Sequence, residues 1–301
     1  MKHLFILNPT AGGGKRTEQV RTEILETMET QSDPWELYET QGIQDATRKV
    51  SEAAATGEPL RVYACGGDGT LNECVNGAVG QPHVALTHFP AGTGNDFIKT
   101  FTTGTEHFFK LQNLLDPQEM AVDIMEVGGR YGINICSVGL DARIAADVHQ
   151  YSGLPGVKGK TAYFLSLFAN IGKGIARPFE VEVGGVNYNQ KFTLICLCNG
   201  RSYGGAFTPV PEALPNDGLF DILLVDKISR AGALGLVQKY AAGRYREIPK
   251  LIAHVQNTEM TIRSDRKFPV NVDGEILYMQ EATFRLLPAA LRFFAPKQAG
   301  F

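Results

Sequence analysis

The sequence predicts a two-domain protein, with an N-terminal doubly wound α/β domain over residues 1–122 and a C-terminal antiparallel β-sandwich domain over residues 123–286. The length of 301 residues suits two domains better than one or three. Residues 1–100 alternate between strand-like and helix-like periods, as βαβ units do, whereas from about residue 120 short extended runs are joined by Gly-Gly pairs. We therefore expect a separate sheet in each domain and a cleft between the domains.

In the N-terminal half, short apolar runs alternate with segments of helical period. Strands are predicted at residues 4–7, 35–40, 60–65 and 84–89, and helices at 17–30, 44–56 and 70–79. In the first helix, the spacing predicts an apolar stripe that faces the sheet, made of Val20, Ile24, Leu25 and Met28.

In the C-terminal half, Gly128-Gly129 and Gly184-Gly185 each join two extended runs, which favours hairpin turns because glycine adopts positive φ readily. Further strands are predicted at residues 219–225, 259–264, 269–274 and 283–287, and helices near 141–150, 161–173 and 230–242. The tail 287–301 contains Phe293 and Phe294, so we expect it to pack back onto the protein rather than to lie in solvent.

Composition and charge narrow the class of protein. The net charge of −3 and the pI of about 6.1 disfavour a nucleic-acid-binding protein that relies on counterion release. The five cysteines lie mostly in apolar runs, which indicates reduced core residues rather than disulfides. The N-terminal apolar run is too short for a signal peptide, and no run reaches the length of a membrane span. We expect a cytoplasmic protein with at most peripheral membrane contact.

The loop Gly66-Gly67-Asp68-Gly69-Thr70 follows a predicted strand and precedes a predicted helix. Backbone N–H groups at such a junction can face a single anion, and the helix N-terminus adds a favourable field. Phosphate is therefore the expected ligand, with Asp68 placed to orient a metal ion or an acceptor hydroxyl. The alternative is an ordinary strand-to-helix turn. A dinucleotide site of the Rossmann type is disfavoured, because Asn72 stands where the pattern G-x-G-x-x-G requires glycine.

Two further glycine-rich loops follow predicted strands, NPTAGGGK at residues 8–15 and AGTGNDF at residues 91–97. The first is only loosely similar to a Walker A loop, because Arg16 follows Lys15 where serine or threonine is required, and taken alone it could be a surface turn. All three loops follow the carboxyl ends of predicted parallel strands, where open α/β sheets bind ligands. Together they predict one phosphate-binding site.

These segments resemble the diacylglycerol kinase catalytic-domain family, which includes sphingosine kinases and bacterial lipid kinases. The resemblance rests on NPTAGGGK, GGDGTLNE and AGTGNDF, and extends through LPNDGLFDI at 214–222 and NVDGE at 271–275. It implies an active site between the domains and a tail, 287–301, that packs on the first domain. By motif match it implies that ATP contacts Asn8, Pro9, Thr10, Ala11, Gly12, Thr40, Gly66, Gly67, Asp68, Gly69, Thr70, Leu71, Asn72 and Thr93.

Two acidic segments of the second half complete the expected chemistry. The resemblance implies Mg²⁺ between the Asp217 carboxylate and the backbone carbonyls of Leu214 and Leu219, and hard oxygen ligands suit this ion. The alternative is a plain β-turn at Pro-Asn-Asp-Gly. The resemblance also implies a general base in the segment Asp273-Gly274-Glu275, since an attacking hydroxyl must lose its proton. Both Asp273 and Glu275 are candidates, and a charged hairpin tip is the alternative.

The leading prediction is an ATP- and Mg²⁺-dependent lipid kinase that phosphorylates the hydroxyl of diacylglycerol or a similar lipid and yields phosphatidic acid. An NAD kinase, which shares a GGDGT loop, and a non-catalytic lipid-binding regulatory module of the same fold are the alternatives. The sequence leaves both a monomer and a homodimer open.

A lipid acceptor requires contact with the inner face of the membrane. The first candidate for this docking surface is Lys158, Lys160 and Lys173 beside Tyr163, Phe164, Leu167 and Phe168. The second candidate is Lys239, Arg244 and Arg246.

Overall fold

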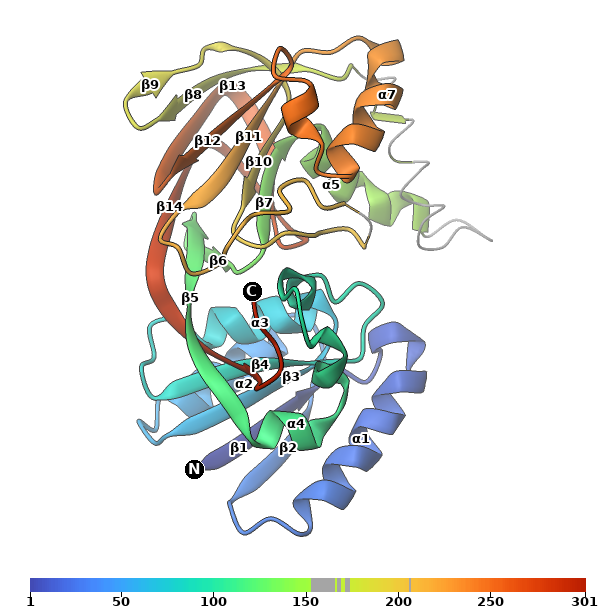
Figure 1. Cartoon of the computed structure of the whole chain (residues 1–301), viewed down its shortest axis with the longest axis vertical. Coiled ribbons are helices and arrows are strands. Elements are labelled where there is room, and N and C mark those ends of the chain that lie inside the picture. The colour runs from blue at the N-terminus through green and yellow to red at the C-terminus, as the bar shows by residue number, and fades with distance from the viewer. Residues whose placement is uncertain (153–165, 167–168, 171–173, 206) are drawn as a thin grey trace.

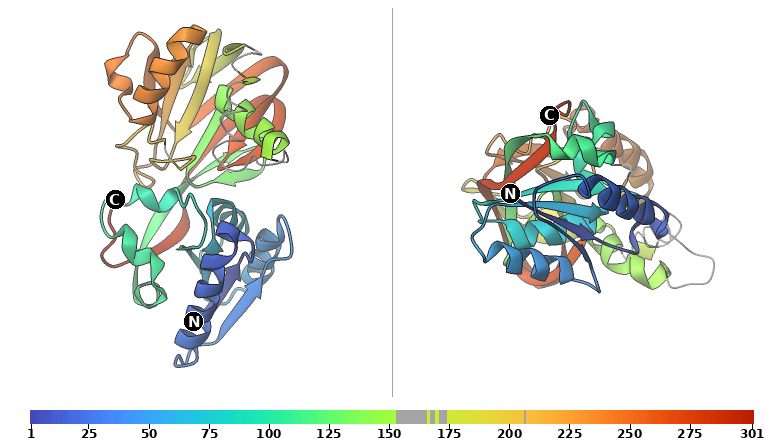
Figure 2. Two further views of the ribbon diagram at one scale, coloured as in Figure 1. Left: turned by 90° about the vertical axis from the view of Figure 1, so that its right-hand side faces the viewer. Right: turned by 90° about the horizontal axis from the view of Figure 1, so that it is seen from below.

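The computed structural model describes residues 1–152, 166, 169–170, 174–205 and 207–301 (Figure 1). It has two lobes, an α/β lobe at the bottom of the view and a lobe of antiparallel strands at the top. Figure 2 shows the same two lobes from two other directions, with both chain termini on the α/β lobe. None of the described helices is long and apolar enough to span a membrane.

The α/β lobe is built on a parallel sheet in the order β4-β3-β1-β2. Its strands are β1 (Lys2–Leu7), β2 (Trp35–Glu39), β3 (Leu60–Gly66) and β4 (Val84–Pro90). Its helices are η1 (Ala11–Gly13), α1 (Lys15–Met28), α2 (Asp45–Ala54), α3 (Asp68–Ala78), η2 (Phe97–Thr100), η3 (Thr105–Phe109) and α4 (Leu111–Leu115). The helix α1 packs against α4, and α2 packs against α3.

The predicted strands and helices of this lobe are all confirmed, and their ends differ by at most two residues. One predicted core residue is wrong. Val20, Ile24 and Met28 of α1 are buried, but Leu25 is 42% exposed. The buried three repeat every fourth residue, and Leu25 lies about 100° around the helix from Ile24, which turns it away from the sheet.

The upper lobe is antiparallel throughout. Its strands are β5 (Pro117–Val127), β6 (Arg130–Gly132), β7 (Ile135–Gly139), β8 (Arg177–Val183), β9 (Val186–Asn187), β10 (Gln190–Cys198), β11 (Phe220–Asp226), β12 (Ile252–Asn257), β13 (Glu259–Val272) and β14 (Glu275–Pro296). Its helices are α5 (Leu140–Ser152), α7 (Arg230–Ala241) and η4 (Tyr245–Glu247). Both β7 and β8 pair with β10 and β13, so the strands close around one apolar core. The predicted helix at 161–173 lies largely outside the described residues.

The two lobes are joined by a ribbon of β5 and β14, which runs down one side of the molecule (Figure 1). The strand β14 pairs with β13 at its start and, near its end, with β4, where Arg292 and Phe293 lie parallel to Ala85 and Leu86. Strand pairing is therefore continuous from one lobe to the other, and our expectation of two separate sheets is wrong. The physical reason is that the tail continues as a strand and adds to the edge of the parallel sheet.

The boundary between the two apolar cores lies within this ribbon, between Ile124 and Met125 of β5. Val122 and Ile124 belong to the α/β core, together with the tail residues Phe293 and Phe294, which are fully buried. Met125 begins the core of the upper lobe. The five cysteines are buried and unpaired, as the sequence predicted.

Candidate active site

The three glycine-rich loops meet at the carboxyl edge of the parallel sheet. Their backbones touch, since a Cβ on Gly92 would lie 2.4 Å from the Cα of Gly67, and a Cβ on Gly12 would lie 2.4 Å from the carbonyl oxygen of Ala91. Glycine is therefore required at positions 12 and 92 for one loop to pack against the next. By contrast, a Cβ on Gly69 would meet no atom within 4 Å, so this position faces open space.

Hydrogen bonds hold these loops in place without a ligand. The Asn8 side chain donates to the Thr70 hydroxyl at 3.2 Å and accepts from the Thr10 N–H at 3.0 Å. The N–H groups of Ala91 and Gly92 both donate to the carbonyl of Gly66, at 2.8 and 3.0 Å. The loops are thus preorganised, which lowers the ordering cost of binding.

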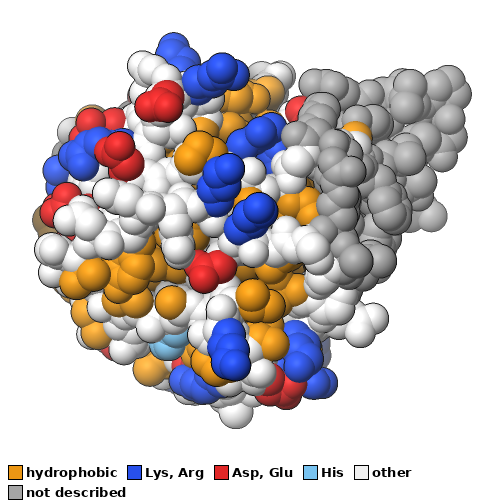
Figure 3. Space-filling model, turned by 90° about the horizontal axis from the view of Figure 1, so that it is seen from above, with side chains coloured by type: hydrophobic (Ala, Val, Ile, Leu, Met, Phe, Trp, Pro, Cys, Tyr) orange, Lys and Arg blue, Asp and Glu red, His pale blue; other side chains and the backbone are white. Residues whose placement is uncertain are grey.

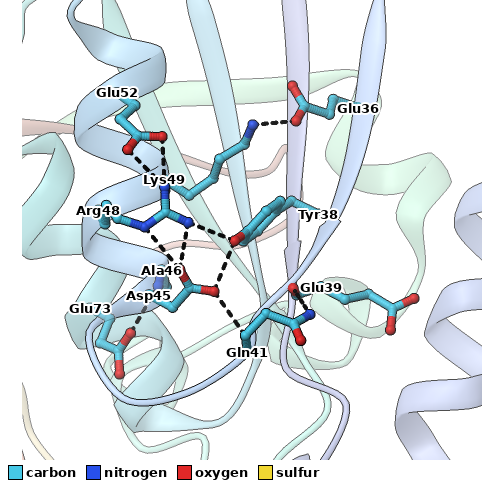
Figure 4. Close-up of polar contacts among 10 residues, drawn as sticks. All are labelled: Glu36, Tyr38, Glu39, Gln41, Asp45, Ala46, Arg48, Lys49, Glu52 and Glu73. Carbon is cyan, nitrogen blue, oxygen red and sulfur yellow. Dashed lines mark hydrogen bonds and ion pairs between the residues drawn. The ribbon is translucent and has the colours of Figure 1, made fainter.

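Thr40 lies at the same edge, directly after β2, and a polar network fixes its loop (Figure 4). The Asp45 carboxylate accepts from the Tyr38 hydroxyl at 2.9 Å and from the Gln41 N–H at 2.8 Å. Arg48 donates to both Asp45 and Tyr38 at 2.7 Å. The Gln41 N–H and the Arg48 guanidinium hold the pKa of Asp45 below its ordinary value. The network ties the chain after Thr40 to the start of α2.

The residues that we expected to contact ATP differ in how far they are exposed to solvent. Thr10, Gly12, Gly69 and Thr93 are exposed at the loop edge, and Asn8, Pro9, Ala11, Thr40, Gly67 and Asp68 are half-buried there. Gly66, Thr70, Leu71 and Asn72 are buried. The Asn72 side chain donates across the lobes, to the Tyr131 carbonyl at 2.9 Å and to Asp273 at 3.2 Å, so it bridges the domains.

The start of α3 fits a nucleotide phosphate. The N-cap of α3 is Gly67, which has no side chain to accept from the first-turn N–H groups. Donors are thus left for an anion at this edge.

A cleft of about 250 Å³ lies between the lobes and is lined by four aspartates, Asp68, Asp96, Asp141 and Asp273. The first two come from the α/β lobe and the other two from the upper lobe. Asp96 accepts from the Gly205 N–H at 3.0 Å, which adds a second link across the cleft. An acidic cleft of this kind repels a free anion, so phosphate groups would enter it together with a cation.

Asp273 occupies the turn between β13 and β14 with a φ of +50°. Its carboxylate accepts from three successive N–H groups, at 2.7 Å from Ile133, 3.1 Å from Asn134 and 2.8 Å from Ile135. Burial raises the pKa of Asp273 to about 6, and these N–H donors oppose the rise. The other candidate base, Glu275, is exposed and is not among the residues that line the cleft.

Sequence reasoning missed Asp141, which lies in the first turn of α5 and accepts from the Ser137 hydroxyl at 2.7 Å. Burial raises the pKa of its carboxyl above the ordinary value. A signal was present, because Gly139 with a φ of +101° ends β7 and a helix follows, which repeats the strand-glycine-helix pattern of the phosphate loops. Asp96 lies within the motif AGTGNDF but was also not singled out.

An apolar groove continues from the cleft into the upper lobe. The two share Asp141 and Tyr203 in their walls. The rest of the groove is almost entirely apolar, and its lining includes Leu140, Ile144, Leu194, Phe207, Val225, Leu236, Val237 and Tyr240. Its enclosed part measures only about 70 Å³, so a long chain would have to extend out of it. The polar cleft thus opens into a surface that suits an apolar group.

The expected metal segment lies apart from the cleft lining. Asp217 is exposed, and its carboxylate accepts from the Leu219 N–H at 3.0 Å. Asp123 of β5 accepts from the Gly218 N–H at 2.8 Å. Partial desolvation raises the pKa of Asp217, the Leu219 N–H opposes the rise, and the charges of Asp221 and Asp123 add to it. The described part of the chain brings no three acidic, His or Cys side chains together as metal ligands, so a cation here would depend on the carbonyls of Leu214 and Leu219.

Of the two expected docking surfaces, the first lies outside the described residues, since it comprises Lys158, Lys160, Lys173 and their apolar neighbours. In the second, Lys239 and Arg244 form ion pairs with Glu247, and Arg246 pairs with Glu212. These pairs neutralise much of the positive charge on which the expectation depended.

Comparison with known proteins agrees with this architecture. Residues 2–127 match the diacylglycerol kinase catalytic domain, and residues 134–295 match the YegS C-terminal NAD kinase beta sandwich-like domain. A diacylglycerol kinase of Staphylococcus epidermidis is 29% identical over 294 residues, which covers 97% of this chain and 92% of the relative. A crystal structure of a diacylglycerol kinase from Bacillus anthracis superposes with a TM-score of 0.70 at 22% identity, over 97% of this chain and 96% of the other. The two matched domains, in this order and over nearly the whole chain, show that the protein belongs to the diacylglycerol kinase family of lipid kinases, which are phosphotransferases.

Proposed function

We propose that this protein transfers the γ-phosphoryl group of ATP to the hydroxyl of diacylglycerol or a similar lipid, and so forms phosphatidic acid. The observation that carries the proposal is the continuity of three elements: the glycine-rich loop edge, the cleft with its four aspartates, and the apolar groove that shares Asp141 and Tyr203 with the cleft. In this order, the three elements suit a nucleotide, a reacting hydroxyl and an acyl chain.

In the proposed reaction, the lipid hydroxyl oxygen attacks the γ-phosphorus of ATP. A new O–P bond forms, the bond to the β,γ-bridging oxygen breaks, and ADP leaves. Asp273 accepts the proton of the hydroxyl, because it lines the cleft and its pKa of about 6 leaves it mostly ionised at neutral pH. When bound, Mg²⁺ would neutralise charge on the phosphates. The loop N–H groups orient the nucleotide, which is the main source of rate in phosphoryl transfer.

The apolar groove favours a lipid acceptor over the NAD kinase alternative, since a dinucleotide carries no chain to fill it. The test is a transfer assay with labelled ATP against diacylglycerol, monoacylglycerol, sphingosine, phosphatidylglycerol, undecaprenol and NAD. Labelled phosphatidic acid from diacylglycerol supports the proposal. Label in NAD alone, or in no acceptor, contradicts it.

Replacing Val237 by tryptophan should weaken the use of a long-chain acceptor. Val237 lines the groove from α7, and an indole there would fill the space of the chain. We expect kcat/KM for diacylglycerol to fall by about 10–100-fold, with ATP affinity unchanged. Val186→Trp is the matched control, because Val186 is 52% exposed at a distant hairpin. Equal lipid kinetics in both variants would exclude the groove.

Replacing Asp217 by asparagine tests the proposed Mg²⁺ site. A neutral amide binds Mg²⁺ less well than a carboxylate, so more Mg²⁺ should be needed both for half-maximal activity and for half of any Mg²⁺-dependent rise in Tm. Glu58→Gln, at an exposed turn of the α/β lobe, is the control. If Asp217→Asn and the parent titrate alike in both measurements, Mg²⁺ does not depend on this carboxylate.

A further inference from the structure

A separate cavity lies on the other side of α5 from the cleft. In the first turns of this helix, Asp141 faces the cleft, whereas Arg143 lines a cavity of about 480 Å³ between the start of β8 and the bend of β13 at residues 264–267. Figure 3 shows the upper lobe from above, where Lys and Arg side chains lie among apolar ones. Among the described residues, none lines both this cavity and the cleft.

The Arg143 guanidinium is only partly satisfied. Its Nη2 atom donates to the carbonyl oxygens of Gly174 and Ile175, both at 2.9 Å. Its Nε and Nη1 atoms are buried and have no hydrogen-bond partner. Burial, and then the charge of Arg177, lower the pKa of Arg143. Arg143 as a whole is half-buried, but guanidinium N–H groups that are buried without a partner are costly unless an anion binds the group.

The charged side chains around Arg143 also favour binding of an anion. Arg177, Arg266 and Lys267 also line the cavity, against one carboxylate, Asp265. Arg266 and Lys267 form no ion pair with any described residue. Even without Arg177, the side chains of Arg143, Arg266 and Lys267 against Asp265 leave two positive charges, more than a monoanion such as a carboxylate would balance. A dianion with several oxygens matches both this charge and the fork of donors on arginine.

We propose that this cavity binds a phosphate group, at a site distinct from the catalytic cleft. The volume exceeds that of phosphate alone, and Phe179 and Phe268 form apolar parts of the wall, so the site also has room for a group attached to the phosphate. The same chemistry is offered by inorganic phosphate and by the headgroup of an anionic phospholipid. The proposal does not depend on the lipid kinase activity.

The first arm of the test measures the Tm of the full chain against inorganic phosphate, with chloride at equal ionic strength as reference. We expect phosphate to raise the Tm of the parent, and the double variant Arg266→Gln/Lys267→Gln to need at least tenfold more phosphate for the same rise. Arg244→Gln/Arg246→Gln is the matched control, since it removes the same charge from side chains that are already ion-paired. This control should respond like the parent.

The catalytic cleft also offers a phosphate site, so a further variant separates the two. Gly69→Val changes the glycine-rich loop at residues 66–70. If phosphate binds in the cavity lined by Arg143, this variant should still show the rise in Tm with phosphate. Arg143→Met should lose it. Where Arg143→Met does not fold, the Arg266→Gln/Lys267→Gln variant still decides, because both of its side chains lie near the surface.

The second arm uses phosphatidylcholine vesicles with and without phosphatidic acid, in a sedimentation assay. If the headgroup is the source, the Arg266→Gln/Lys267→Gln variant should bind the acidic vesicles about 30-fold more weakly than the parent, as expected for two cationic side chains near an anionic surface. Equal vesicle binding together with a lost phosphate response assigns the site to free phosphate. If the variant matches the parent in both arms, the proposal is overturned.

Discussion

Replacing Asp273 by asparagine should lower the rate of phosphoryl transfer by about 10²–10⁴-fold at saturating ATP and lipid, the usual contribution of a general base. Asparagine tolerates the φ of +50° at this position, so the turn between β13 and β14 is retained. The amide keeps only one of the two acceptor oxygens, either the one that serves Ile133 or the one that serves Asn134 and Ile135, so a lower Tm is also expected. The amide cannot take up the proton of the attacking hydroxyl. Initial rates with labelled ATP measure the effect.

Glu275→Gln is the matched control, because it removes a carboxylate from the same hairpin at an exposed position outside the cleft lining. We expect its rate to stay close to that of the parent. If Asp273→Asn keeps the parent rate and shows only a lower Tm, Asp273 positions residues 133–135 and is not the base. A large loss in Glu275→Gln would reverse the assignment.

The raised pKa of Asp273 gives opposite signs for rate and stability. Since the base must be ionised, the rate should rise with pH through about 6. The folded state, however, holds this proton more tightly than the unfolded chain, whose ordinary value is 3.8. The contribution of Asp273 to stability is therefore complete below pH 3.8 and is lost as the pH rises through about 6. Relative to the Tm of Asp273→Asn, the Tm of the parent should therefore fall as the pH rises from 3.8 to about 6.

Replacing Gly69 by valine should weaken ATP binding by about 10–100-fold without unfolding the protein. A side chain at this position meets no protein atom within 4 Å, so it enters the space where phosphate oxygens would approach the first turn of α3. The loss corresponds to about one hydrogen bond to a charged group. Calorimetric titration with ATP measures it.

Gly235→Val is the matched control for this substitution. Gly235 also lies in a helix, α7, and a Cβ there likewise meets no atom within 4 Å. We expect its ATP affinity and Tm to match those of the parent. Unchanged ATP affinity in a folded Gly69→Val variant would remove the nucleotide from this loop. Gly12 and Gly92 are unsuitable for the test, because a side chain there would strike a neighbouring loop.

The candidate site could be predicted where it depends on local sequence. The three glycine-rich loops each follow their own strand, and parallel strands bring their carboxyl ends to one edge. The role of the individual glycines could not be predicted, because the contact between Gly92 and Gly67 is tertiary. The groove was also beyond the sequence, since Asp141 and Tyr203 come together only when β7 and β10 pair.

The fold was predicted least well at the tail. Pro288 and the two alanines after it interrupt the apolar run, and a proline in such a run argues against a central strand. In the structure, β14 passes this point with a shift of register between Leu287 and Leu291 and a φ of +52° at Ala289. An irregularity of this kind lets a strand continue through residues that its sequence pattern appears to exclude.

The shared ribbon also sets an order for folding during synthesis. Phe293 packs against Phe97, Phe101 and Phe108, with ring centroids 5.3–6.5 Å apart, so the α/β core needs residues that the ribosome adds only after the whole upper lobe. Until then these aromatic rings and the free edge of β4 are uncovered, a state prone to aggregation. Once β14 has paired with β13, it carries the missing strand to β4. We therefore expect the α/β lobe to complete its folding last, because the end of β14 can pair with β4 only after the upper lobe has formed.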